Sequence, residues 1–389
     1  MKLLIIGLED FSQPRAWSGI PYFMLAGLRR AGLDLIAGYP IQSIVPKWQR
    51  GREWVFRAAR KALGRGVPLW FARYTHANMQ VVAAEIDRRV AQTQPDAVYA
   101  IVTPEVGLCQ FRQPLIYTSD GTFAACDGYY DWFSNWQRES RQAARAAEQA
   151  TLRKAAAVIY PSAWALESAA HDYGIARDKL HLIAYGANLP AEHVPPTVAD
   201  VPISAPIGAA PLRLLFVAVE QHRKGLDTVL DAQDALIRAG VPTQVDIVGT
   251  SVTLPLRHPQ LTTVHGFLRK GVPKQAAQLQ ALYAKAHLFC VPSRAEAYGI
   301  VFCEAMALGL PVIARATGGV PSIVQHGVNG LLLTQNATAE AYCEAIMSLI
   351  HQPQHYAAMR QAARHRYETV LNWDVFAARV RREGLGIKD

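Results

Sequence analysis

The feature that most constrains this fold is an alternation of short apolar runs with longer segments of helical pattern, along the whole chain. This alternation is typical of strand–helix–strand units, whose parallel strands are buried on both faces of the sheet. Six runs in the first half and six in the second predict strands. They are KLLIIGL, LDLIAGY, DAVYAIV, PLIYTS, AAVIYPS and LHLIAYG, followed by LRLLFVAV, TQVDIVGT, LTTVHGF, AHLFCVPS, LPVIARA and GLLLT. The sequence therefore predicts an α/β protein with doubly wound parallel sheets.

The length and a composition break predict two domains. The chain has 389 residues, whereas one domain usually has about 100 to 200. Residues 192–213 are rich in Pro and Ala and nearly free of charge, which is the composition of a linker. We predict a Rossmann-like domain over residues 1–192, a linker over 193–211 and a second Rossmann-like domain over 212–370. Residues 371–389 predict a C-terminal helix that packs back on the first domain.

Composition limits the location and the partners. No stretch of about 18 uncharged apolar residues occurs, so no segment is expected to span a membrane. The opening MKLLIIGLED has acids directly after its apolar run, which favours a buried strand over a signal peptide. Five Cys without a Cys-x-x-Cys pair predict free thiols in a reducing cytoplasm. The net charge of +9 favours an anionic partner, namely nucleic acid, a membrane surface or a phosphorylated small molecule.

The stretch SRAEAYGIVFCEAMALGLPV, residues 293–312, places two carboxylates eight residues apart. A strand is predicted before it, Glu296 lies in a loop, and a helix is expected to begin near Gly299 with Glu304 about one turn inside. Gly299 lets the backbone approach a ligand closely, and the first N–H groups of a helix favour phosphate. This spacing is not an i, i+4 pair. We therefore predict one acid on the loop and one beside a phosphate site, although solvated, unrelated acids are the simpler alternative.

This stretch resembles the Glu-x7-Glu signature of glycosyltransferase family 4, almost continuously from Ser293 to Leu333. In weaker form the resemblance extends over essentially the whole chain, including SGIPYF, RKGLD and GFLRKG. It implies a GT-B fold, in which two Rossmann-like domains face a central cleft. It also implies a retaining enzyme that binds the acceptor on its N-terminal domain and a nucleotide sugar on its C-terminal domain.

The resemblance also implies roles for the residues of the signature. Glu304 would bind the ribose of the nucleotide, and Glu296 the hydroxyls of the donor sugar. A carboxylate on the sugar side favours the positive ring that develops as the glycosyl bond breaks. The diphosphate would be held by backbone groups of Tyr298, Gly299, Ile300 and Val301.

A cation for the diphosphate is expected in the loop that begins the second domain. Lys224, between a predicted strand and a predicted helix, matches the lysine of the family's Lys-Gly motif. Negative charge grows on the departing diphosphate, so positive charge must face it. The family usually carries an Arg five or six residues earlier, where this chain has Ala218 and Val219. Arg223 or His222 could supply that charge instead.

Three further positions are assigned by the resemblance. Gly19 lies in the loop after the first predicted strand and resembles the Gly-rich loop near donor phosphate and acceptor, although a plain turn is the alternative. Gly266, which begins GFLRKG, is expected to bind the donor. Asp120 stands at a strand end where many family members have His. Since an ionised Asp accepts but cannot donate hydrogen bonds, we predict that it orients acceptor or sugar rather than acting as the base.

Residues 47–74, KWQRGREWVFRAARKALGRGVPLWFARY, interleave eight Lys or Arg with three Trp and two Phe. Basic and aromatic residues at helical spacing predict a helix at the surface of an anionic membrane. Nucleic acid is the less favoured partner because no nucleic-acid-binding module is recognised. A solvated basic helix with buried aromatics is the remaining alternative.

The sequence thus predicts a cytoplasmic retaining glycosyltransferase, peripheral on the inner face of the membrane, that transfers sugar from a nucleotide sugar to a hydroxyl of a glycan or lipid-linked acceptor. No metal or other cofactor is expected, because no Asp-x-Asp motif lies in a plausible loop and the lysine and helix can carry the diphosphate charge. The alternatives are an epimerase or phosphorylase of the same fold, or a non-catalytic binder of membrane or nucleic acid. A Rossmann oxidoreductase is disfavoured, since no Gly-x-Gly-x-x-Gly follows the first strand.

Overall fold

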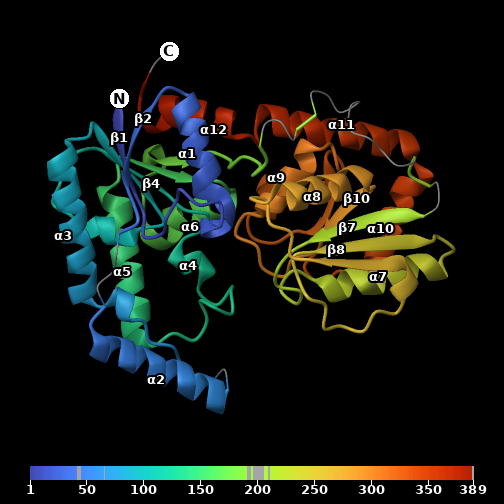
Figure 1. Ribbon diagram of the computed structural model, residues 1–389, viewed down its shortest axis with the longest axis horizontal. Coiled ribbons are helices and arrows are strands. Elements are labelled where there is room, and N and C mark those ends of the chain that lie inside the picture. Colours follow the sequence, from blue (N-terminus) through green and yellow to red (C-terminus); the bar gives the residue numbers. More distant parts are fainter. Residues whose placement is uncertain (42–44, 65, 191–193, 196–205, 209–210, 388–389) are drawn as a thin grey trace. The chain divides into compact units, whose positions relative to one another are not determined.

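A computed structural model describes residues 1–41, 45–64, 66–190, 194–195, 206–208 and 211–387. The chain divides into two compact units, one of Met1–Ile183 with Phe376–Asp389 and the other of Ala184–Val375 (Figure 1). The linker predicted over 193–211 lies largely outside the described residues. No helix in the part of the chain described above is long and apolar enough to cross a membrane.

The first unit contains a parallel six-stranded sheet of order β2-β1-β3-β4-β5-β6. Its strands are β1 (Lys2–Ile6), β2 (Asp34–Gly38), β3 (Ala97–Ile101), β4 (Leu115–Thr118), β5 (Ala157–Tyr160) and β6 (Leu180–Leu182). Each lies within a predicted run, and β3, β4 and β5 are buried along their whole length. The strand order reverses between β1 and β3. Because parallel crossovers are right-handed, helices on either side of this point cover opposite faces of the sheet.

One helix of the first unit, α2, contains the first part of the basic and aromatic segment 47–74. The helices of this unit are α1 (Ile20–Arg30), α2 (Lys47–Leu63), α3 (His76–Thr93), α4 (Phe123–Cys126), α5 (Arg138–Lys154) and α6 (Ala163–Tyr173). The segment 47–74 is helical only as far as Leu63, because Gly64 ends the helix with a φ of 91°. Beyond it Leu69, Trp70 and Phe71 are buried. Leu69 and Phe71 pack with residues of α4 and α5, so only the first part of the segment is a surface helix.

The end of the chain belongs to the first unit from Phe376 onward. The predicted C-terminal helix is α12 (Trp373–Arg379), which continues into a π-helical turn, η9 (Val380–Gly384). The Arg381 guanidinium donates a hydrogen bond to the carbonyl of Ala31 at the end of α1. This contact ties the last turn to the beginning of the chain.

The second unit contains a parallel six-stranded sheet of order β12-β11-β10-β7-β8-β9. Its strands are β7 (Leu212–Val217), β8 (Thr243–Val248), β9 (Thr262–Gly266), β10 (Leu288–Val291), β11 (Val312–Arg315) and β12 (Gly330–Leu333). Its helices are α7 (Leu226–Arg238), α8 (Pro273–Lys285), α9 (Ile300–Ala307), α10 (Ala339–His351) and α11 (Pro353–Thr369). Every predicted strand of this half is present. Both units are therefore doubly wound α/β sheets, as the alternation of runs predicts.

Candidate active site

The candidate site lies in the second unit, where the strand order reverses between β7 and β10. These strands are neighbours in the sheet, although β8 and β9 separate them in the chain. Their parallel pairing brings the loop of residues 218–225, after β7, beside the loop of residues 292–299, after β10. Ligands of doubly wound sheets bind at this kind of switch point, beyond the carboxyl ends of the strands. The first loop carries Lys224 and the second carries Glu296.

Lys224 and Glu296 form an ion pair across the switch point. Only 12% of the lysine side chain and 9% of the glutamate side chain are exposed. The hydroxyl of Ser293 also donates to Glu296, with Oγ 3.0 Å from Oε2. A buried carboxylate needs such partners, because the loss of hydration otherwise favours its neutral form. The structure thus brings together the two residues that the sequence assigned to diphosphate and donor sugar, although they are 72 positions apart.

Two arginines brace these loops against each other. Arg223 donates from Nη1 to the carbonyl of Ala295 at 2.8 Å, and Arg294 donates to both carboxylate oxygens of Asp227 at 2.9 and 2.7 Å. The backbone N–H of Arg294 also donates to the Arg223 carbonyl at 2.7 Å. Burial opposes ionisation of Asp227, yet the hydrogen bonds from Arg294 hold its pKa below the ordinary value. The contacts of Arg223 and the Arg294 N–H therefore join the loop that carries Lys224 to the loop that carries Glu296.

The glycine after Lys224 is required by close packing between the two loops. Gly225 has a φ of 76°, and a Cβ atom there would lie 2.4 Å from the carbonyl oxygen of Pro292. No side chain fits at that distance in that conformation. This contact explains the Lys-Gly order, since the glycine brings the backbone that carries Lys224 against the end of β10.

Gly299 begins the helix that carries the second acid. It is the N-cap of α9 with a φ of 99°, and a Cβ atom there would lie 2.4 Å from the Phe302 ring. The peptide N–H groups of Ile300 and Val301 therefore belong to the first turn of α9, where they have no partner within the helix and are suited to bind an anion. The Tyr298 side chain is buried and its hydroxyl donates to the Tyr185 carbonyl at 2.9 Å. Its side chain thus anchors this turn in the unit.

Glu304 lies in the second turn of α9 and is completely buried. Its Oε1 is ion-paired with Lys270, and its Oε2 accepts a hydrogen bond from the Tyr283 hydroxyl at 3.3 Å. Lys270 lies in the loop between β9 and α8, and Tyr283 lies in α8. Neither partner was identified from the sequence. The adjacent Arg and Lys in GFLRKG signal positive charge in that loop, but no spacing rule connects it to Glu304.

The other residues predicted for the site, Gly266, Gly19 and Asp120, lie outside the two loops and α9. Gly266 ends β9 with a φ of 67°, and its carbonyl accepts from the Gly249 N–H at 2.7 Å. Gly19 and Asp120 belong to the first unit. Gly19 is the N-cap of α1, and it follows two non-glycine residues with positive φ, Trp17 and Ser18. Such a run is strained and is typical of functional loops.

Asp120 follows β4 and is partly buried. In the adjacent turn, the Ser119 hydroxyl donates to the Gly121 carbonyl at 2.8 Å. The Thr122 hydroxyl caps α4 by accepting from the Ala125 N–H at 3.0 Å. These two hydroxyls therefore stabilise the turn and the helix start beside Asp120.

Two family models match this chain. The model of glycosyl transferases group 1 matches residues 204–366, and the model of glycosyltransferase family 4 matches residues 38–189. Together they cover more than half of the chain and parts of both units. The first contains the two loops, α9 and both lysine–glutamate pairs, and the second contains Asp120 and α2.

Individual relatives match only part of the chain. The chain is 32% identical over 233 residues to a D-inositol 3-phosphate glycosyltransferase 1 of Catenulispora acidiphila, covering 56% of this chain and 54% of the relative. It is 30% identical over 220 residues to a GDP-mannose-dependent alpha-(1-6)-phosphatidylinositol monomannoside mannosyltransferase of Mycolicibacterium smegmatis, covering 51% and 56% of the two chains. The chain thus spans about half the length of these curated relatives.

A solved structure matches over nearly the full length. The sucrose-phosphate synthase of Thermosynechococcus elongatus superposes with a TM-score of 0.66 at 18% identity, over 99% of this chain and 98% of the other. At that identity the match concerns the fold, which is GT-B, as the resemblance implied. With both family models matched, over residues 38–189 and 204–366, the chain belongs to glycosyltransferase family 4.

Proposed function

We propose that this protein is a retaining glycosyltransferase that moves a sugar from a nucleotide-sugar donor to a hydroxyl of a glycan or lipid-linked acceptor. The observation that carries the proposal is the buried Lys224–Glu296 pair at the strand switch point of the second unit, beside the glycine-started helix α9. A cation, a carboxylate and helix N–H groups in one place match what a sugar diphosphate requires.

The proposed roles follow from charge. As the bond between sugar and diphosphate breaks, negative charge grows on the diphosphate and positive charge grows on the sugar ring. Lys224 and the N–H groups at the start of α9 stabilise the diphosphate. Glu296 accepts hydrogen bonds from sugar hydroxyls and favours the positive ring, and Glu304 accepts from the ribose. Gly266 lies beside the nucleotide, and Arg223 holds the loop that presents Lys224, or binds the phosphate itself if it leaves the Ala295 carbonyl.

The relatives support a nucleotide-sugar donor and an acceptor rich in hydroxyls. One is named for GDP-mannose and a phosphatidylinositol mannoside, and the other for inositol 3-phosphate. We propose by analogy that this protein acts in the synthesis of a cell-surface polysaccharide or glycolipid. Because the matched regions cover only about half of those relatives, donor base, donor sugar and acceptor have to be determined on this chain itself.

A ligand screen tests the central proposal. Thermal shift is measured with UDP, GDP, ADP and dTDP sugars, because a ligand that binds only the native state raises its melting temperature. One nucleotide class should raise Tm, and the same donor should lose its sugar only when an acceptor is added. Phosphate-dependent cleavage without an acceptor would indicate a phosphorylase, and sugar isomerisation would indicate an epimerase. No shift with any donor, together with binding to vesicles or DNA, would indicate a non-catalytic binder.

We also propose that the reaction is independent of metal, with the positive charge supplied by Lys224 and the start of α9. Turnover should then be unchanged after exhaustive dialysis against EDTA. A loss that Mg²⁺ or Mn²⁺ restores would contradict this part of the proposal.

On the first unit we propose that Asp120 and the loop of Gly19 contact the acceptor or the transferred sugar. Asp120→Asn keeps the shape but removes the charge, so it should lower kcat about tenfold with nucleotide affinity unchanged. Asp178→Asn, at an exposed position in the same unit, is the matched control. A lower Tm with full kcat would instead assign Asp120 a structural role.

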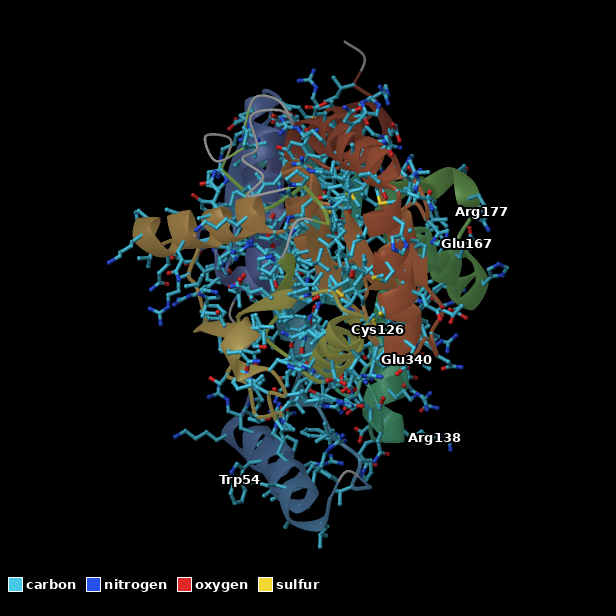
Figure 2. All side chains as sticks on the ribbon, turned by 90° about the vertical axis from the view of Figure 1, so that its right-hand side faces the viewer. Trp54, Cys126, Arg138, Glu167, Arg177 and Glu340 are labelled. Atoms are coloured by element: carbon cyan, nitrogen blue, oxygen red, sulfur yellow. The ribbon has the colours of Figure 1, made fainter. Side chains whose placement is uncertain are left out.

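We further propose that α2 binds the anionic inner face of the membrane, which would make the protein peripheral and cytoplasmic. One face of α2 is attached to the unit: Asn78 donates to Gln49 at 2.5 Å, and the Ala72 N–H donates to Glu53 at 3.2 Å. Helical spacing places Trp54, Val55, Ala58 and Ala62 on the opposite side. Figure 2 shows Trp54 on the outer side of this helix, and 68% of its surface is exposed.

Exposed basic residues, Lys47, Arg50 and Lys61, lie along the Trp54 side of that apolar face. An exposed apolar face bordered by cations is typical of a helix that lies in a membrane interface. Two variants should release the protein from phosphatidylserine vesicles. One is Trp54→Ser, and the other combines Arg50→Glu with Lys61→Glu. Arg88→Glu combined with Arg177→Glu, at two exposed arginines of the same unit, gives the same change of total charge and is the control. Cosedimentation that does not change in these variants would leave α2 as a solvated helix.

A further inference from the structure

The buried carboxylate of Glu304 is linked to the surface of the second unit through one side chain. Glu304 has no exposed surface, whereas 30% of the side chain of its ion-pair partner Lys270 is exposed. A carboxylate buried without a counter-ion takes up a proton in preference to remaining charged. The cation that keeps this acid ionised therefore lies in the loop between β9 and α8, outside the Glu-x7-Glu stretch.

The other groups near Glu304 are a tyrosine, a thiol and the arginines of the helix α11. Tyr283 from α8 donates to the second carboxylate oxygen, and its ring is stacked on Phe289 of β10 at 5.6 Å. Burial raises the pKa of the Cys303 thiol beside it on α9 to about 12, so that thiol is neutral. From α11, Arg360, Arg364 and Arg366 donate to the carbonyls of Gly309, Ala307 and Ser322, at 3.2, 3.0 and 2.9 Å. Arg364 is also ion-paired with Glu368 of the same helix.

We infer that Lys270 is a positioning residue for nucleotide binding, which keeps Glu304 ionised and oriented toward the ribose hydroxyls. The inference rests on the proposed function, in which Glu304 accepts hydrogen bonds from the ribose. The two lysines then have separate roles. Lys224 contacts the diphosphate and sugar, whereas Lys270 acts on the nucleoside through Glu304. An ionised carboxylate accepts from two ribose hydroxyls, while a protonated one donates a hydrogen bond and accepts fewer.

Removal of Lys270 should therefore affect the ribose contact and nothing else in the donor. In Lys270→Met, the buried acid loses the ion-pair partner of its Oε1 atom and with it the contact that orients the carboxylate. Nucleotide affinity should fall at least about tenfold. Lys270→Arg should restore most of the affinity.

The experiment is calorimetric titration with UDP, GDP and ADP and with their 2′,3′-dideoxy forms, which lack the ribose hydroxyls. The wild type should prefer a ribonucleotide to its dideoxy form at least about tenfold. Lys270→Met should lose that preference while binding the dideoxy form as the wild type does. On a Glu304→Gln background, Lys270→Met should cause no further loss. Lys274→Met, on the first turn of α8 and exposed, is the matched control.

The outcomes separate the inference from the proposed function. A wild type that binds none of the three nucleotides overturns the inference, and if no donor of the ligand screen shifts its melting temperature either, the proposed function is overturned with it. Binding by the wild type with unchanged preference in Lys270→Met overturns the role of Lys270 alone. An equal loss for ribo and dideoxy forms, or a loss that persists on the Glu304→Gln background, shows direct contact with the nucleotide and also overturns the inference. Circular dichroism and Tm of Lys270→Gln and Lys270→Arg control for misfolding of Lys270→Met.

Discussion

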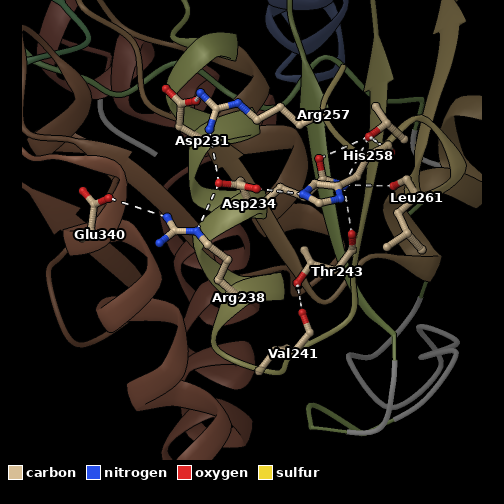
Figure 3. Close-up of polar contacts among 11 residues, drawn as sticks. Asp231, Asp234, Arg238, Val241, Thr243, Arg257, His258, Leu261 and Glu340 are labelled. Atoms are coloured by element: carbon tan, nitrogen blue, oxygen red, sulfur yellow. Dashed lines mark hydrogen bonds and ion pairs between the residues drawn. The ribbon is translucent and has the colours of Figure 1, made fainter. Parts of the chain in front are cut away.

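Two groups of ion pairs in the second unit differ in how deeply their side chains are buried. On the outside of α7, a network surrounds Asp234, which bonds to His258 at 2.9 Å and to Arg238 and Arg257 at 3.2 Å each (Figure 3). The arginines are more than half exposed and also reach Glu340 and Asp231. By contrast, Glu296 at the switch point and Glu304 in the following helix α9 are buried, and each is ion-paired with a lysine.

The difference separates a surface network from a candidate site. Exposed ion pairs contribute little to stability, since water replaces a lost partner and salt screens the attraction. A buried acid with one counter-ion is costly to maintain, and removing either partner leaves an uncompensated charge. Lysine–glutamate pairs with a buried acid, at a strand switch point or in the helix that follows it, are therefore a sign of ligand chemistry, whereas the Asp234 network is typical of a solvated helix face.

The largest expected effect comes from Glu296→Gln, which breaks the buried pair on its acidic side. The amide keeps the shape but cannot stabilise positive charge on a sugar ring, so we expect kcat to fall about 100-fold. Nucleotide affinity should change by less than about threefold, because Glu296 is assigned to the sugar. Steady-state kinetics and calorimetric titration measure the two effects. Wild-type turnover in this variant would remove Glu296 from the site.

Breaking the same pair on its basic side should act on binding. Lys224→Met should weaken the binding of a nucleoside diphosphate about tenfold or more, because a charge-assisted contact is lost. Binding of the corresponding nucleoside should stay the same. Lys274→Met provides the control at an exposed lysine of the same unit. Equal losses for nucleoside and diphosphate would place Lys224 away from the phosphates.

A buried acid in the first unit extends the comparison between buried acids and acids of an exposed network. Glu148 accepts from the Phe123 N–H at 2.7 Å and from the Tyr173 hydroxyl, and burial raises its pKa from 4.5 to about 7. Because the pKa is raised on folding, this group favours the folded state below pH 4.5 and loses that contribution as pH rises through 7. The loss amounts to roughly 3 kcal/mol.

Glu148→Gln, which has no charge at any pH, should therefore remove this dependence. Melting temperatures of wild type and variant are compared between pH 4.5 and 8. The wild type should lose stability relative to the variant as the pH rises. A constant difference between the two across the range would show that Glu148 ionises as easily in the folded protein as in the unfolded one.

The smallest effect is expected from Asp234→Asn in the surface network. Hydrogen bonding from His258, followed by contacts with the arginines, holds the pKa of Asp234 below its ordinary value. A lowered pKa contributes stability above the ordinary value, and that contribution disappears as the pH falls through the folded pKa. We expect a small decrease of Tm at pH 7, no difference in strong acid, and unchanged kcat. A loss of turnover would mean that the network serves the reaction after all.

Much of the fold could be predicted because its signals are local. A run such as LFCVPS is a strand because it is short, apolar and followed by a loop, and β10 lies within it. Gly299 predicted the start of α9 because few other residues accept its φ of 99°. The structure of segment 47–74 was harder to predict. Basic and aromatic residues occur along the whole segment, but only its first part is a surface helix. Gly64 ends α2. Trp54 lies on this helix and is exposed, whereas Trp70 lies beyond Gly64 and is buried.

The sequence by itself determined the alternation of strands and helices, the positions of both acids and of Lys224, and the family to which the chain belongs. Only the tertiary structure decided which lysine meets which acid. Lys224 and Glu296 are 72 positions apart, and Lys270 and Glu304 are 34 apart. The first pair meets because β7 and β10 are neighbours in the sheet, and the second because the loop after β9 reaches α9. Sequence periodicity describes each element alone, whereas strand order and helix packing come from burial across the whole unit.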